Sequence, residues 1–295
     1  MMKKLKSYIK LMRVHQWVKN IFIFMPLFFS FKFTDVSLLI ANIWSFIGFS
    51  FIASTIYIVN DWCDYKADML HPEKKHRPIA SGAVSRKEAL ILLIILFFIS
   101  FTIYVGVLKN MEALYLIIGY FVLNLLYSFK LKHIPVVDIS IVAVGFVIRV
   151  FVGGIVIDTP ISQWLIVMTF LLALLLALGK RRDDVIIYEK TGNKTRKNID
   201  GYNLIFANAG IIIITAVILV AYIMYTMSEE VIARNGNNLY LTSLFVIIGL
   251  LRYLQIIFVD ENSGSPTKIF FKDHFLHVII ILWSASFLLL SLYYK

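Results

Sequence analysis

The chain has 295 residues, one cysteine (Cys63) and few charged residues. A single cysteine excludes an intramolecular disulfide. Charged residues make up only 16% of the chain, whereas hydrophobic residues make up 60% and the mean hydropathy is +0.81. Soluble globular domains carry about 25% charged and about 45–50% apolar residues. The composition therefore excludes an ordinary soluble domain and predicts an all-α protein that crosses a membrane several times.

Several familiar catalytic signatures are also missing. The six histidines are scattered without ligand spacing, so the sequence predicts no zinc or haem site. A Ser/His/Asp arrangement, a Walker motif and a dinucleotide fingerprint are absent where their structural context would require them. No low-complexity tract or flexible linker interrupts residues 1–295, which predicts a single polytopic membrane domain.

Apolar runs near the ~20 residues that a membrane span requires occur nine times, which predicts nine transmembrane helices. Two polar inserts, 60–88 and 180–203, follow the second and the sixth run. The nine runs lie at 18–34, 38–59, 89–108, 112–130, 136–157, 162–179, 204–227, 239–258 and 275–294.

The distribution of cations predicts the orientation. With the N-terminus in the cytosol, 23 of the 29 Lys and Arg residues face the cytosol, including those of both polar inserts. The basic opening MMKKLKSYIKLMR is then an amphipathic, uncleaved cytosolic segment. The exceptions are Lys32, Lys109, Arg149, Arg234, Arg252 and Lys295.

This orientation also accounts for the net charge of +11, because cations gather at the cytosolic face and attract anionic membrane lipids. No nucleic-acid partner is needed to explain the charge. We therefore expect a multi-pass protein of the cell membrane with its polar inserts in the cytosol. The sequence is also compatible with a homo-oligomer.

The first polar insert begins with a row of carboxylates. Asn60, Asp61, Asp64 and Asp68 are spaced so that a helix would place them along one face. With a rise of ~1.5 Å per residue, Asp61 and Asp68 would lie about 10 Å apart along the helix axis. Such a row favours a cation, and hard oxygen ligands suit Mg²⁺, which also binds substrate phosphates. We predict that these four residues hold Mg²⁺ and that the three aspartates are catalytic.

Cations near this row predict phosphate binding. Arg77 stands beside the rigid Pro78, and its planar guanidinium suits two phosphate oxygens at once. Lys19 lies at the mouth of the first span. Residues at the end of the fourth span and the start of the fifth face the same side of the membrane. The predicted substrate-binding residues here are Lys19, Asn60, Arg77, Tyr127, Lys130, Lys132 and Asp138.

The second polar insert starts with Lys180, Arg181 and Arg182, directly after a span. Asp183 and Asp184 follow, but their spacing does not repeat the carboxylate row. We therefore predict a second anion site made of cations rather than a second Mg²⁺ site. Arg149 lies deep in the fifth span, where it needs a carboxylate or carbonyl partner.

The segment NDWCDYKAD resembles the first aspartate-rich motif, NDxxDxxxD, of the UbiA superfamily of intramembrane prenyltransferases. The number of spans and the places of the two inserts are similar as well. The resemblance implies a helical bundle around a central cavity, with Mg²⁺ and a diphosphate at its cytosolic mouth. Typical members carry a second motif, DxxxD, in the later insert and transfer a prenyl group to an aromatic or other acceptor.

This chain has GKRRDDV in place of DxxxD. That segment is similar to the decaprenyl-phosphate phosphoribosyltransferase branch of the superfamily, as are QWVKN at 16–20, HPEKKHRPIASG at 71–82 and LKHIPVVD at 131–138. The branch implies phosphoribosyl diphosphate as donor and a polyprenyl phosphate as acceptor, with a role in the synthesis of cell-wall precursors. The diphosphate, the 5-phosphate and the acceptor phosphate would bring three anionic groups into one site. Such a site favours more Lys and Arg residues and fewer carboxylates.

Two alternatives remain open from the sequence. A prenyltransferase of the same superfamily would use an allylic diphosphate as donor. A transporter of phosphorylated metabolites would move its substrate across the membrane without changing it, and would not depend on the aspartate row.

Overall fold

A computed structural model describes residues 2–294 apart from 71–73, 193, 195, 197, 261–268, 270 and 271. Parts of both polar inserts, including the first three residues of HPEKKHRPIASG, therefore lie outside the described residues. The described residues are helical or irregular and contain no strand. The chain folds into two compact units.

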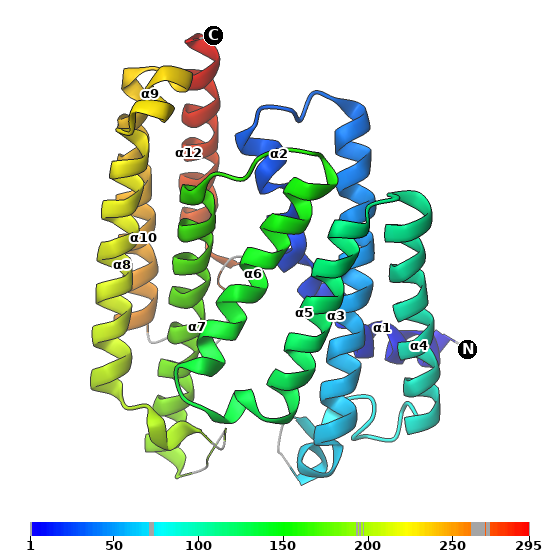
Figure 1. Ribbon diagram of the computed structural model, residues 1–295. Helices are drawn as coiled ribbons and strands as arrows, with labels where there is room; N and C mark the ends of the chain where they lie inside the picture. Colours follow the sequence, from blue (N-terminus) through cyan, green and yellow to red (C-terminus); the bar gives the residue numbers. More distant parts are fainter. Residues whose placement is uncertain are drawn as a thin grey trace. The chain divides into compact units, whose positions relative to one another are not determined.

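Unit 1 comprises residues 1–132 and 144–162, and unit 2 comprises residues 133–143 and 163–295. Helix α6 thus contributes its first part to unit 2 and the rest to unit 1 (Figure 1). The helices of unit 1 are α1 (Met2–Met12), η1 (Val14–Phe24), α2 (Met25–Phe29), α3 (Val36–Leu70), η2 (Lys74–His76), α4 (Arg86–Thr102), η3 (Ile103–Val107), α5 (Met111–Phe129), most of η4 (Leu131–His133) and part of α6 (Val137–Val156). Those of unit 2 are α7 (Gln163–Thr191), η5 (Ile199–Gly201), α8 (Leu204–Thr226), α9 (Glu229–Asn235), η6 (Asn237–Thr242), α10 (Ser243–Phe258) and α12 (His274–Tyr293).

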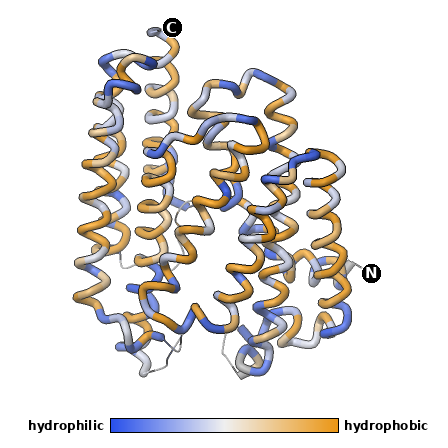
Figure 2. Tube along the Cα trace, in the orientation of Figure 1, coloured by the Kyte–Doolittle hydropathy of each residue, from blue (hydrophilic) through white to orange (hydrophobic). Residues whose placement is uncertain are grey.

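Eight helical segments of the described chain are long and apolar enough to cross a membrane. They coincide with the second to the ninth predicted spans. Figure 2 shows hydrophobic residues along most of each long helix and hydrophilic residues near helix ends and in loops. Two helices continue past their predicted ends into the polar inserts, α3 to Leu70 and α7 to Thr191.

Side-chain caps define where several of these helices begin. Ser85 and Glu88 form a reciprocal capping box at the start of α4. The side chains of Asn110, Asn203 and Asp273 accept backbone N–H bonds at the starts of α5, α8 and α12. Each cap satisfies a backbone N–H that has no partner within its own helix.

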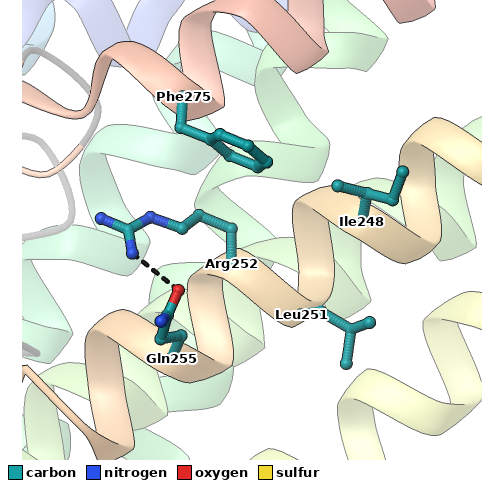
Figure 3. A pocket seen from close by; sticks show the side chains of 5 residues that line it. All are labelled: Ile248, Leu251, Arg252, Gln255 and Phe275. Carbon is teal, nitrogen blue, oxygen red and sulfur yellow. Dashed lines mark hydrogen bonds between the residues drawn. The ribbon is translucent and has the colours of Figure 1, made fainter.

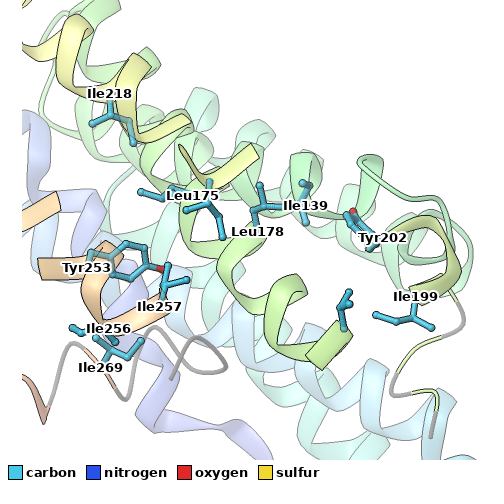
Figure 4. Close-up of a cluster of buried hydrophobic side chains, with 12 residues drawn as sticks. Ile139, Leu175, Leu178, Ile199, Tyr202, Ile218, Tyr253, Ile256, Ile257 and Ile269 are labelled. Carbon is cyan, nitrogen blue, oxygen red and sulfur yellow. The ribbon is translucent and has the colours of Figure 1, made fainter. Parts of the chain in front are cut away.

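Each unit has its own apolar core. In unit 1, α3 packs against α4, α5 and η1, and buried residues such as Phe49 and Tyr104 fill the space between helices. In unit 2, α7 packs against α8 and α10 packs against α12. Figure 4 shows the core of unit 2, where Leu175, Tyr253 and Ile257 are among the buried side chains.

The predicted first span, 18–34, differs from the other eight because it is not among the helical segments that are long and apolar enough to cross a membrane. A 3₁₀-helix, η1, is followed by the short helix α2. In a 3₁₀-helix every third residue lies on the same face, and Trp17, Asn20 and Ile23 share such a face. Trp17 donates to Ser54 and Asn20 donates to Ser50, both on α3. Three residues of a 3₁₀-helix and four residues of an α-helix both rise about 6 Å. The spacing of Trp17 and Asn20 on η1 therefore matches the spacing of Ser54 and Ser50 on α3.

Helix α6 holds the other side of η1. Arg149 donates from Nε to Asn20 Oδ1 at 2.8 Å, and its other nitrogens donate to the Gly145 carbonyl and the Tyr120 hydroxyl. The predicted need of Arg149 for a carbonyl partner is thus met. Gly153 packs directly on the backbone of Ile23, where an added Cβ would lie 1.9 Å from the carbonyl oxygen.

Gly153→Ala is expected to lower the free energy of unfolding by about 1–3 kcal/mol, because the clash is with backbone that cannot rotate away. Gly119→Ala on α5 is the matched control, since nothing beyond its own stretch of helix lies within 4 Å of its added Cβ. Alanine favours the helix there by up to about 1 kcal/mol. Unfolding of both variants in mixed detergent micelles measures the difference, and equal effects would contradict the close packing of η1 on α6.

Candidate functional site

The carboxylate row lies on the last turns of α3, as the spacing predicts. Asp61 and Asp68 are buried, with 2% and 4% of their surfaces exposed. The Asp64 side chain, between them, is 42% exposed. Asn60 is half-buried. The row therefore has one accessible carboxylate flanked by two that are enclosed by protein.

Three cations from separate segments of unit 1 pair with these carboxylates. Arg13, between α1 and η1, donates to Asp61. Arg77 donates from Nη1 to Asp61 Oδ1 at 3.1 Å and to Asp68 Oδ2 at 2.8 Å. Lys132 Nζ lies 3.1 and 3.0 Å from the two carboxylate oxygens of Asp64. The charges of three carboxylates are thus balanced by three cations.

Arg13 was not among the site residues predicted from the sequence. Its backbone is in the left-handed region, with φ 51° and ψ 48°, and this turns the chain between α1 and η1. The guanidinium also lies 4.9 Å from the centre of the Tyr57 ring. The conformation of Arg13 has no signal in the sequence, because non-glycine residues with positive φ are uncommon. Its charge at the mouth of the first span was the available clue.

The donor set of the row fits a divalent cation. Asp61 Oδ1 and Asp68 Oδ2 contact the same nitrogen of Arg77, so both oxygens face one cation-sized position. No three His, Cys, Asp or Glu side chains within the described ranges converge as a complete metal cage. Mg²⁺ in phosphate-binding sites usually takes one or two carboxylates and completes its shell with water and substrate oxygens. Two converging carboxylates meet that requirement.

The other predicted binding residues of unit 1 are less closely connected to the row. Lys19 lies on η1 and is half-buried. Tyr127 is half-buried and Lys130 is exposed, at the end of α5. In the part of the chain that the structure describes, neither Tyr127 nor Lys130 forms a hydrogen bond or ion pair with the three aspartates.

Unit 2 holds a second polar cluster around Asp138, on the first turn of α6. Asp138 is fully buried, and it accepts from Arg181 Nε at 2.7 Å and from the Tyr202 hydroxyl at 2.5 Å. Burial and the hydrogen bond to Asp138 raise the pKa of Tyr202, so its hydroxyl stays a donor. Tyr202 also accepts from the backbone N–H of Val136. Tyr202 was not predicted from the sequence, because one tyrosine in a polar insert carries no signal.

The predicted anion site of unit 2 is engaged with protein groups in the structure. Arg181 donates from Nη1 to Asp184, which also accepts from Arg196. Arg182 donates to Asn208 and to the carbonyl of Ile257. Both arginines are buried, whereas Lys180 is exposed. A ligand that bound these guanidinium groups would share them with protein acceptors.

A pocket of about 400 Å³ lies elsewhere in unit 2, on α10 and the start of α12. Figure 3 shows Arg252 among its lining residues, donating to Gln255 at 2.7 Å beside Phe275. Arg252 also donates to Asp273, and this hydrogen bond lowers the pKa of the Asp273 carboxyl. None of the predicted site residues lines this pocket, so we do not assign it to the reaction.

Comparisons with known proteins agree with the helical fold. Residues 22–280 match the UbiA prenyltransferase family. A decaprenyl-phosphate phosphoribosyltransferase from Mycolicibacterium smegmatis is 31% identical, over 94% of this chain and 90% of the relative. One from Corynebacterium glutamicum is 30% identical, over 93% of this chain and 83% of the relative.

Among solved structures, a UbiA homolog from Archaeoglobus fulgidus bound to GPP and Mg²⁺ has a TM-score of 0.69 to this chain. The two are 18% identical, and the match covers 97% of this chain and 99% of the homolog. This likeness establishes the fold. The protein therefore belongs to the UbiA prenyltransferase family, as a multi-pass membrane transferase with the UbiA fold.

Proposed function

We propose that this protein transfers a 5-phosphoribosyl group from phosphoribosyl diphosphate to a polyprenyl phosphate and releases diphosphate. The observation that carries this choice of donor is the similarity, over more than nine-tenths of the chain, to two proteins named decaprenyl-phosphate phosphoribosyltransferase. The replacement of a second carboxylate motif by Lys180, Arg181 and Arg182 supports the same choice, because the reaction brings together more phosphate groups than prenyl transfer does.

In this proposal Asp61, Asp64 and Asp68, helped by Asn60, hold a divalent cation, which we take to be Mg²⁺. The cation, when bound, would stabilise negative charge on the departing diphosphate. Arg77 and Lys132 are already paired with the carboxylates, and they exchange these partners for phosphate oxygens. Lys19 of unit 1 binds a further phosphate oxygen, and Lys180, Arg181 and Arg182 remain the predicted anion site of unit 2.

The bond changes then follow from the substrates. A phosphate oxygen of the lipid forms a bond to the anomeric carbon of the ribosyl group, and the bond from that carbon to the diphosphate oxygen breaks with its electron pair. An ionised phosphate has no proton to lose, so no general base is required. Asp61 and Asp68 are enclosed by protein, and this low-dielectric setting strengthens their hold on a cation.

We further propose that η1 and α2 cross the membrane as the first of nine spans. Eleven residues at ~2.0 Å and five at ~1.5 Å give about 30 Å, which matches the thickness of the hydrocarbon core. Nine spans would place both polar inserts on the cytosolic face with the N-terminus, in keeping with the distribution of Lys and Arg. The active site would then face the cytosol, where phosphoribosyl diphosphate is available.

Purified protein given radiolabelled phosphoribosyl diphosphate, a polyprenyl phosphate and Mg²⁺ is expected to form a labelled lipid. Excess EDTA should abolish the product and added Mg²⁺ should restore it. A parallel reaction contains an allylic prenyl diphosphate with an aromatic acceptor. Transfer from the allylic donor without any labelled phosphoribosyl lipid would reject this function in favour of prenyl transfer.

A further inference from the structure

Arg77 occupies the position between two carboxylates of the candidate metal site. Its Nη1 atom contacts Asp61 Oδ1 and Asp68 Oδ2, and no other residue of the described chain bridges two carboxylates of the row. The Asp61 and Asp68 side chains are 3% and 5% exposed, whereas that of Arg77 is 28% exposed. The bridging cation is therefore the most accessible member of this trio.

The backbone that carries Arg77 is fixed independently of these ion pairs. The backbone N–H of Arg77 donates to the carbonyl of Lys74 in η2, and the carbonyl of His76 accepts from Lys10 Nζ on α1. Directly after Arg77 and Pro78, Ile79 is buried in an apolar cluster with Leu11 and Ile58. The side chain of Arg77 is thus free to change partners while its loop stays in place.

The charge balance of the row argues against binding of a divalent cation alone. With Arg13, Arg77 and Lys132 in place, a cation would add two positive charges to a cluster that is already neutral and mostly buried. A cation that arrives with a diphosphate brings its own negative charge. Arg77 then has phosphate oxygens to bind in place of the two carboxylates.

We propose that Arg77 is a resting counter-ion that couples the binding of the divalent cation to the binding of diphosphate. Without ligand it neutralises Asp61 and Asp68 and disfavours the cation. With diphosphate it moves to the phosphate oxygens and leaves both carboxylates to the cation. The inference deepens the proposed site, and it holds for any donor that carries a diphosphate.

Binding of Mn²⁺ to the purified protein, measured by electron paramagnetic resonance with and without inorganic diphosphate, tests this coupling. Diphosphate should tighten Mn²⁺ binding to the wild-type protein by about tenfold or more, within the usual range of coupling between sites. Arg77→Gln should bind Mn²⁺ alone about tenfold more tightly than wild type, and diphosphate should then change its affinity by less than about threefold. Lys75→Gln is the matched control, because Lys75 is an exposed cation of the same loop.

Unchanged or weaker binding of Mn²⁺ to Arg77→Gln would overturn the proposal. Arg77→Lys provides a second test if the glutamine variant does not fold, because lysine keeps the charge but lacks the planar fork. It should bind Mn²⁺ alone with an affinity near that of wild type and should show weaker coupling to diphosphate. Inorganic diphosphate contains neither a ribosyl nor a prenyl group. A failure of phosphoribosyl transfer would therefore reject phosphoribosyl diphosphate as the donor. It would not affect the comparison of Mn²⁺ binding between wild type and the Arg77 variants.

Discussion

Asp64→Ala is expected to lower the rate of transfer by about 1,000-fold or more, because the variant loses a carboxylate that holds the cation against the leaving diphosphate. Asp64 is the best member of the row for this test, since its side chain is 42% exposed and pairs only with Lys132 among the described residues. The pair is part-buried, with the Lys132 side chain 17% exposed, and Asp64 is its more exposed member. Ion pairs close to the surface contribute only about 0–1 kcal/mol of stability. The folded protein should therefore persist while activity is lost.

The control is Asp200→Ala, which also removes a carboxylate that pairs with a lysine, here in an exposed pair. The side chains of Asp200 and Lys194 are 59% and 51% exposed. Initial rates of lipid labelling, measured at equal amounts of folded protein, should separate the two variants. Full activity in Asp64→Ala would contradict the metal site on α3. Flux of a phosphorylated metabolite into sealed vesicles that is unaffected by Asp64→Ala would favour the transporter.

Much of the helical framework could be predicted from the sequence, because spans are set by apolar length. Eight predicted spans coincide with helices, and Asp61, Asp64 and Asp68 lie on α3. The first span could not be predicted in its form. The 3₁₀ conformation of η1 depends on tertiary partners, namely Ser50 on α3 and Gly153 on α6. A hydropathy pattern contains no information about such partners.

For the candidate site, the sequence predicted the types of residue better than the hydrogen bonds and ion pairs between them. The sequence shows carboxylates and cations in polar inserts, and the structure adds which of them meet. Arg13 pairs with Asp61 from a left-handed backbone position, and Tyr202 donates to Asp138, which is 64 positions away in the chain. For Arg181 the structure adds an intramolecular partner to the predicted role in phosphate binding. These two roles require different experiments to separate.

A double-mutant cycle on Asp138 and Arg181 is expected to separate the structural role of Arg181 from its predicted role in phosphate binding. The side chains are 0% and 3% exposed, so each single change leaves a buried charge with fewer partners. Asp138→Leu and Arg181→Met should each lower the free energy of unfolding by about 3–5 kcal/mol. The double variant replaces the buried pair by apolar groups, which is often neutral or stabilising. Its stability should return to within about 1–2 kcal/mol of wild type.

Activity of the double variant then decides the role of Arg181. If the guanidinium also binds a phosphate, as we propose, the double variant stays about 100-fold or more slower than wild type although it is folded, because a charge-assisted hydrogen bond to the substrate is missing. Recovery of activity together with stability would instead make Arg181 a structural partner of Asp138 and leave phosphate binding to other cations. Asp184 keeps Arg196 as a partner in the double variant, whereas the Tyr202 hydroxyl loses Asp138 as its acceptor. The difference between the two outcomes therefore reports on the Asp138–Arg181 pair, of which Arg181 is the proposed phosphate ligand.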